Sequence, residues 1–261
     1  IRLIFATIFI IIAHKITVGT VAPWNADPER WLWLGLSGFV GFVLGDIFLF
    51  QAFVWVGARI SMLMMSLAPL IATFIAWVFL GEALVFSQLI GIALTLSGVG
   101  WVICEGNHRN KVKNKHYQRG VLFGLAGATG QALGVVLAKN GLVGNFPPFS
   151  ANFIRLTTAL VTMWTYAIMK GEVKITLKSL MGKPVAGAAI GSGAFIGPFL
   201  GVSLSLFALQ HAPVGIVSTL TALSPIFLLP IGNFYFNEKF GWGTVAGTLI
   251  AMIGVGVLFL L

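Results

Sequence analysis

The chain has 261 residues, of which 58% are hydrophobic and 9% are charged. Soluble domains carry about 25% charged residues, so this composition excludes a water-soluble globular protein and indicates one that crosses a membrane several times. The formal net charge of +9 does not indicate nucleic-acid binding, because nearly all Lys and Arg residues fall in loops between apolar runs, without a basic groove or interleaved aromatic platform.

The apolar runs are continuous and therefore predict helices, because β-barrel strands would alternate apolar and polar residues. A helix needs about 20 apolar residues to cross the ~30 Å hydrocarbon core. In chain order we predict nine spans: 3–13, 32–56, 60–80, 86–104, 121–138, 151–169, 185–209, 214–236 and 242–261. The tryptophan-rich segment 23–33 is expected to be an interfacial loop.

The two halves of the chain repeat each other at a constant spacing of 156 residues. The segment from Pro69 to Glu82 recurs from Pro225 to Glu238. Glycines extend the same register: Gly35 with Gly191, Gly41 with Gly197, Gly45 with Gly201, Gly91 with Gly247 and Gly98 with Gly254. Such a register indicates a duplication.

The triplet Ile-Arg-Leu around Arg2 also recurs around Arg155, where a predicted span precedes it. We therefore expect a parent protein of five helices plus five, whose opening helix is absent from this sequence. An odd number of helices per copy places the copies in opposite orientations. The expected fold is an all-α membrane protein with an inverted repeat of two five-helix units: a first repeat at 1–104, a basic connecting loop at 105–119 and a second repeat at 120–261.

Two prolines at equivalent repeat positions, Pro69 and Pro225, fall inside predicted spans and are expected to kink them. A carbonyl freed by proline needs another partner or a wet cavity, so the kinks predict a binding and gating site. Side chains on the same faces suit an amphipathic organic solute: Met62 and Ser66 beside Pro69, and Ser218 and Thr221 beside Pro225. Ordinary interhelical packing is the alternative.

Asp46 is an acidic residue well inside a predicted span, with Gln51 further along the same run. An intramembrane carboxylate costs roughly 2.5–3.5 kcal/mol on insertion scales, so we expect it to face a partner or water. It is a candidate to bind a substrate ammonium group or a coupling proton, and a buried pair with a side chain such as Lys139 is the alternative. Gln131, on the span that opens the second half, is a further candidate lining residue.

Other polar residues are assigned structural roles. Glu82 and Glu238 precede the next predicted helices and are expected to cap them rather than to carry protons. Arg2 and Arg155, near the start of matching spans, are expected to anchor at the interface. No Walker, GxGxxG, HExxH or CxxC motif occurs, so we expect neither a cofactor nor a metal.

This pattern resembles the drug/metabolite transporter superfamily, specifically its ten-helix permeases built from two EamA domains. The resemblance rests on Pro69, on Leu-Gly-Glu ending at Glu82, on the glycines that follow, and on the second copy, in which Asn237 replaces a glycine. It implies an integral membrane carrier, often an exporter of amino acids or other small metabolites, with a central cavity. It also implies cytoplasmic termini, whereas twelve basic residues on one predicted face against four on the other place the C-terminus outside.

We therefore expect a secondary transporter of small organic metabolites that works by alternating access in a bacterial plasma membrane, in contact with lipids and with proton coupling as an option. Two alternatives stand beside it. The sequence Gly-Leu-Ser-Gly around Ser37 looks like the nucleophile motif of rhomboid intramembrane proteases, although no histidine inside a later span supplies a base. A channel is the other alternative.

Overall fold

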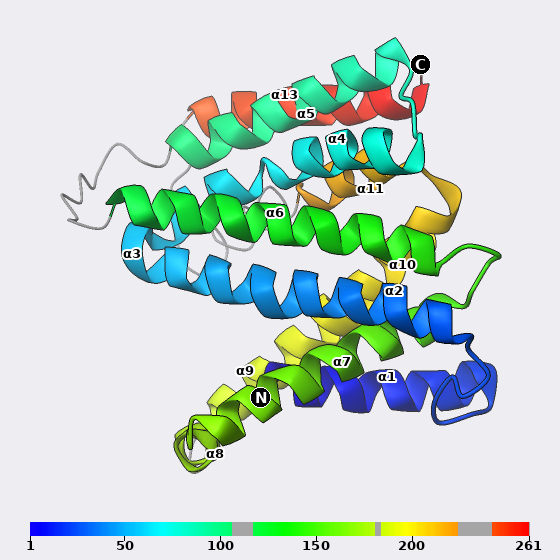
Figure 1. Cartoon of the computed structure of the whole chain (residues 1–261). Coiled ribbons are helices and arrows are strands. Elements are labelled where there is room, and N and C mark those ends of the chain that lie inside the picture. Colours follow the sequence, from blue (N-terminus) through cyan, green and yellow to red (C-terminus); the bar gives the residue numbers. More distant parts are fainter. Residues whose placement is uncertain (106–116, 181–183, 224–241, 261) are drawn as a thin grey trace. The chain divides into compact units, whose positions relative to one another are not determined.

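The computed structural model describes the chain except residues 106–116, 181–183, 224–241 and 261, and Pro225, Glu238 and most of the connecting loop lie outside the described residues. All regular elements in the described part are helical (Figure 1), which confirms the all-α prediction there. They are α1 (Arg2–Val18), α2 (Pro28–Gly38), η1 (Phe39–Gly45), α3 (Asp46–Met65), α4 (Ala68–Leu80), α5 (Phe86–Glu105), α6 (Tyr117–Gly141), α7 (Pro148–Met169), α8 (Val173–Leu180), α9 (Pro184–Ala194), η2 (Phe195–Gly201), α10 (Val202–His211), α11 (Val214–Thr221) and α13 (Trp242–Leu260).

Three helical runs in the described part are long and apolar enough to cross a membrane: Pro28–Gly57, Tyr117–Gly141 and Pro184–His211. The first and third are each assembled from an α-helix, a π-helical segment and a second α-helix. The first ends at Gly57, whose φ of 81° and ψ of 164° interrupt α3. Only glycine adopts this backbone conformation readily, so Gly57 separates two predicted spans at the expected place.

The chain divides into two compact units, each built from both halves of the sequence. Unit 1 contains residues Ile1–Val43 and Gly134–His211, and unit 2 contains residues Leu44–Leu133 and Ala212–Leu261. Within unit 1, α1 packs on α7, which carries the second copy of its Ile-Arg-Leu triplet. Within unit 2, α5 packs on α13, its counterpart at the repeat spacing, so helices related by the repeat are neighbours in each unit. α4 also packs on α11 in unit 2.

The repeat extends to irregular backbone that the sequence did not predict. The π-helical segments η1 and η2 are each seven residues long and occupy equivalent repeat positions. Pro198 lies inside η2 and cannot donate a backbone hydrogen bond, which accounts for a locally widened helix there. η1 contains no proline but has glycines at both positions where η2 has them, Gly41 and Gly45.

The prediction that Pro69 kinks a continuous span is wrong in its geometry. α3 ends at Met65, a turn covers Ser66 and Leu67, and α4 begins at Ala68 with Pro69 in its first turn. A proline in the first turn disrupts no intrahelical hydrogen bond, because the amide it lacks has no intrahelical partner there. The repeat places a second turn at residues 222–223, directly after α11.

One further expectation needs correction, and one helix was not predicted. The predicted interfacial loop 23–33 becomes helical at Pro28, with the preceding residue Asp27 at the N-cap position. A short helix, α8, lies between the predicted spans 151–169 and 185–209, and its Lys174 and Lys178 are exposed one turn apart. Eight residues are too few for a sequence period to stand out, which is why α8 was missed.

The contact between α5 and α13 is reciprocal, and Figure 1 shows these helices side by side. A Cβ added to Gly98 would lie 2.5 Å from the carbonyl oxygen of Gly247 and from the amide nitrogen of Ala251. A Cβ on Gly254 would meet the amide nitrogen of Thr95 and lie 2.8 Å from the carbonyl oxygen of Gly91. Shifting the first contact by the repeat spacing gives the second, with the helices exchanged. Residue numbers rise along one helix as they fall along the other, so the pair is antiparallel.

Candidate functional site

The predicted site residues that the structure describes all lie in unit 2. Asp46 begins α3 and is 6% exposed, while Gln51 on α3 and Gln131 on α6 are half-buried. Met62 packs against a small apolar cluster of Val99, Leu223 and Ala251. Met62 therefore contributes to the apolar packing of unit 2.

The contact between α4 and α11 is a close helix pair lined by small residues. A Cβ on Gly215 would lie 2.5 Å from the Thr73 hydroxyl oxygen, so only glycine lets α11 approach α4 at this point. The Thr73 hydroxyl donates to the carbonyl oxygen of Pro69 at 2.7 Å. Of the predicted residues on α11, Thr221 donates to the carbonyl oxygen of Ser218 at 2.8 Å. The hydroxyl oxygen of Ser218 is buried without a hydrogen-bond partner in the described structure.

Glu82 caps a helix, as expected, but not the helix that follows it in sequence. Its Oε2 accepts a hydrogen bond from the backbone N–H of Val214 at 2.8 Å, and Val214 is the first residue of α11. A carboxylate at a helix N-terminus satisfies a free amide and complements the helix dipole. Glu82 therefore joins the first half of the chain to the start of the helix that pairs with α4.

Unit 1 contains buried polar side chains that the sequence analysis did not assign to a site. Asn152 on α7 is fully buried, and its Nδ2 donates to the carbonyl oxygens of Pro198 at 2.9 Å and Phe199 at 3.3 Å, and to the Ser203 hydroxyl at 2.9 Å. These hydrogen bonds tie α7 to the π-helical segment η2 and to the start of α10. The Oδ1 of Asn152 has no hydrogen-bond partner in the described part of the chain.

Arg155 lies one turn after Asn152 and is 5% exposed, so the expectation that it anchors at the interface is wrong. Its guanidinium carbon lies 5.0 Å from the ring centroid of Phe42 in η1, and its Nε is buried with no hydrogen-bond partner among the described residues. Gly38 packs directly on the backbone of Arg155, and a Cβ on Gly41 would lie 3.6 Å from Nη2 of the Arg155 guanidinium. α7 begins at Pro148, which places Arg155 two turns into the helix.

His14 was also overlooked, because it follows the short predicted span 3–13. The helix α1 continues to Val18, and His14 is fully buried within it. Its Nδ1 lies 2.7 Å from the carbonyl oxygen of Thr20 and its Nε2 lies 2.9 Å from the Ser150 hydroxyl oxygen. Both ring nitrogens are therefore engaged, and His14 links the end of α1 to the start of α7.

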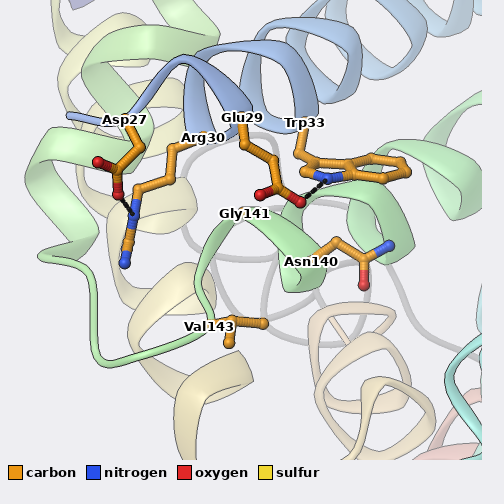
Figure 2. Close-up of a pocket in the computed structure, with 7 residues that line it drawn as sticks. All are labelled: Asp27, Glu29, Arg30, Trp33, Asn140, Gly141 and Val143. Carbon is orange, nitrogen blue, oxygen red and sulfur yellow. Dashed lines mark hydrogen bonds and ion pairs between the residues drawn. The ribbon is translucent and has the colours of Figure 1, made fainter.

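A pocket of about 340 Å³ lies in unit 1 (Figure 2). Arg30 Nε contacts Asp27 Oδ2 at 3.3 Å, and the Trp33 indole N–H donates to Glu29 at 3.3 Å. Charges of both signs therefore line it, and its residues belong to the start of α2 and the segment where α6 ends. These lining residues are Asp27, Glu29, Arg30, Trp33, Asn140, Gly141 and Val143.

The geometry does not support Ser37 as a nucleophile. Ser37 is fully buried, and its hydroxyl donates to the carbonyl oxygen of Gly134. A hydroxyl that donates to a backbone carbonyl between two packed helices contributes to helix packing. No histidine among the described residues forms a hydrogen bond with Ser37 that would let it act as a base. Likewise, the described residues contain no group of three or more His, Cys, Asp or Glu side chains that could hold a metal ion.

Apolar spans, buried polar side chains and repeat-related helix pairs define a polytopic helical membrane protein. The family model of the EamA-like transporter family matches residues 1–104 and 118–260. The chain belongs to this family, which is a family of transporters and not of enzymes. The resemblance seen in the sequence is thereby confirmed.

Relatives and a solved structure agree over almost the whole chain. Two proteins of Archaeoglobus fulgidus, each named an uncharacterized transporter, are 23% and 22% identical to it; the alignments cover 99% and 96% of this chain, and 86% and 84% of those proteins. A crystal structure with a TM-score of 0.69 and 18% identity covers 99% of this chain and 87% of its own. At that identity the likeness shows a shared fold. The chain is an integral membrane transporter.

Proposed function

We propose that the protein is a secondary transporter that moves small organic metabolites such as amino acids across a bacterial plasma membrane by alternating access. Its membership of the EamA-like transporter family, matched in both halves of the chain, carries this proposal. Alternating access needs two similar sets of helices that exchange roles around a solute. A rhomboid-like protease is set aside, because Ser37 is engaged in packing.

The reciprocal contact between α5 and α13 supports an inverted repeat. Antiparallel helices that exchange equivalent contacts are related by a twofold axis perpendicular to both. When both helices cross the bilayer, that axis lies in the membrane plane, which is the symmetry of inverted-repeat transporters. The matching positions of η1 and η2 support the same relation in unit 1.

The turns at residues 66–67 and 222–223 are candidate gating points, because a helix that is already broken can bend there without losing further hydrogen bonds. Ser66 and Pro69 lie at the first turn, and Ser218 and Thr221 precede the second. We propose that these residues, with Met62 and Pro225, contact the solute during the transition. Asp46, Gln51 and Gln131 are proposed to line its path.

Asp46 is the proposed coupling group. A buried carboxylate in a membrane-spanning run has a high free-energy cost unless it pairs with another group, binds a solute cation or takes up a proton.

The test is uptake of a mixture of the L-amino acids by proteoliposomes containing the purified chain, measured by mass spectrometry with protein-free liposomes as control. We expect saturable uptake whose pH dependence changes in Asp46→Asn. Flux that does not saturate at millimolar solute would favour a channel, and an unchanged pH profile would remove Asp46 from coupling.

A further inference from the structure

α7 carries two buried polar side chains one turn apart that contact the two π-helical segments of unit 1. Asn152 donates to backbone carbonyls of η2, and Arg155 lies against Phe42 of η1. The two segments occupy equivalent repeat positions. π-helical turns are rare and are often found at functional sites. This part of α7 is therefore the place in unit 1 where irregular backbone and buried polar groups coincide.

The charge of Arg155 has no counter-charge in the described part of the chain. Arg155 is 5% exposed, its Nε is buried there without a hydrogen-bond partner, and its guanidinium lies against the face of the Phe42 ring. An aromatic face attracts a cation, but it provides no acceptor for the N–H groups. A buried charge in a membrane protein is normally paired or lines an aqueous path. An anion bound from outside the chain would balance the charge of Arg155 and would also accept hydrogen bonds from its N–H groups.

The surroundings of Arg155 fit a planar anion. A guanidinium presents its donors in a rigid fork that matches a carboxylate with two parallel hydrogen bonds. A Cβ on Gly41 would lie 3.6 Å from Nη2 of Arg155 and 3.5 Å from the Cα of Gly134 on α6, so a small side chain at position 41 would reach the fork at ordinary contact distance. One turn earlier, the unpaired Oδ1 of Asn152 offers an acceptor to a hydroxyl or ammonium group of the same ligand.

We propose that Arg155 binds the carboxylate of the transported solute, so that the substrates of this protein are organic carboxylates. The inference rests on the proposed transport function and deepens it by naming the substrate class. Asn152 offers its Oδ1 to the same solute, and through Nδ2 it holds η2 beside α7. An amino acid satisfies the site as well as a simple carboxylic acid does, because Arg155 recognises the carboxylate alone.

Cysteine chemistry tests this site without requiring transport. Replacing the single cysteine by Cys104→Ser gives a background for Gly41→Cys, which places a thiol beside the Arg155 fork. The matched control is Leu156→Cys, because Leu156 is adjacent to Arg155 and is fully buried. The cationic reagent MTSET is applied to the purified full chain, with size-exclusion profiles confirming that each variant is folded.

Three acids are offered as protecting probes, each with its carboxamide: L-leucine and L-leucinamide, L-phenylalanine and L-phenylalaninamide, and succinate and succinamide. We expect Gly41→Cys to react at least tenfold faster than Leu156→Cys, and at least one acid to slow the reaction threefold while its amide does not. Arg155→Gln should abolish that protection, and Arg155→Lys should retain part of it. The proposal is overturned if Gly41→Cys is as unreactive as the control, if no acid protects, or if protection survives Arg155→Gln.

The failure of this proposal and the failure of the transport proposal are distinguishable. Uptake of amides or amines by wild-type proteoliposomes without acid-specific protection would uphold transport and overturn the carboxylate site. Acid-specific protection that depends on Arg155, combined with no uptake of any probe, would uphold the site and overturn transport.

Discussion

Replacing Gly98 by alanine perturbs the α5–α13 contact at a single point. The added Cβ would lie 2.5 Å from the Gly247 carbonyl oxygen and the Ala251 amide nitrogen, whereas ordinary contact begins at 3.4 Å. Both neighbours are helical backbone and cannot rotate away, so the helices must separate, and a gap of about 0.5–1 Å already forfeits a quarter to a half of each dispersion contact. Overpacking of this kind costs about 1–3 kcal/mol.

The matched control is Gly100→Ala on the same helix, because a Cβ there would meet nothing within 4 Å. It isolates the gain in helix propensity, which is up to about 1 kcal/mol for glycine to alanine. The repeat supplies the same experiment a second time. Gly254→Ala should behave like Gly98→Ala, and Gly256→Ala should behave like Gly100→Ala, because a Cβ on Gly256 would also meet nothing within 4 Å.

Thermal unfolding of the four purified variants in one detergent provides the measurement. At about 2–4 °C per kcal/mol for a chain of roughly this size, Gly98→Ala and Gly254→Ala should each melt several degrees below their controls. The double variant should lose less than the sum, because the first substitution already separates the helices. Equal melting of Gly98→Ala and Gly100→Ala, or a loss at Gly98 without one at Gly254, would refute the reciprocal contact.

Two further predictions concern hydrogen bonds between distant segments. Glu82→Ala removes the carboxylate that accepts a hydrogen bond from the Val214 N–H and should lower the free energy of unfolding by about 0.5–2 kcal/mol. Glu82→Gln keeps an acceptor and should lower it less. Equal melting temperatures of both variants and wild type would show that the cap contributes nothing. Asn152→Ala leaves the carbonyls of Pro198 and Phe199 without this donor and should lower the free energy of unfolding by about 1–3 kcal/mol. Backbone hydrogen exchange should rise first in η2. Unchanged exchange in η2 would show that Asn152 does not hold this segment.

The sequence predicted the helical class and the repeat well, because both follow from patterns of residue type along the chain. Apolar runs located the spans, and the glycine register placed Gly98 and Gly254 at equivalent positions. What it did not indicate is that these two glycines lie in one contact, since a register relates positions without saying which helices touch. The π-helical segments were missed because a one-residue expansion of a helix turn leaves no composition signal in η1.

The candidate site was predicted less well. Arg155 was assigned to an interface because the apolar run appeared to begin only four residues before it, whereas α7 begins at Pro148. The available signal was the pair Asn152 and Arg155 at a spacing of three, which places two polar groups on neighbouring positions of one helix face. Pro69 was placed inside a span because hydropathy does not distinguish a kinked helix from two helices joined by a two-residue turn.

The opposite orientation of the two repeats is tested most directly by labelling the exposed residues that follow the repeat-related helices α1 and α7. In the Cys104→Ser background, Thr20→Cys and Glu172→Cys place thiols just beyond Gly19 and Gly171, which end these helices with φ of 82° and 69°. A membrane-impermeant maleimide is applied to intact and then to permeabilised cells. An inverted repeat predicts that one cysteine is labelled from outside and the other only after permeabilisation, which also assigns the cytoplasmic face. Labelling of both from the same side would contradict it.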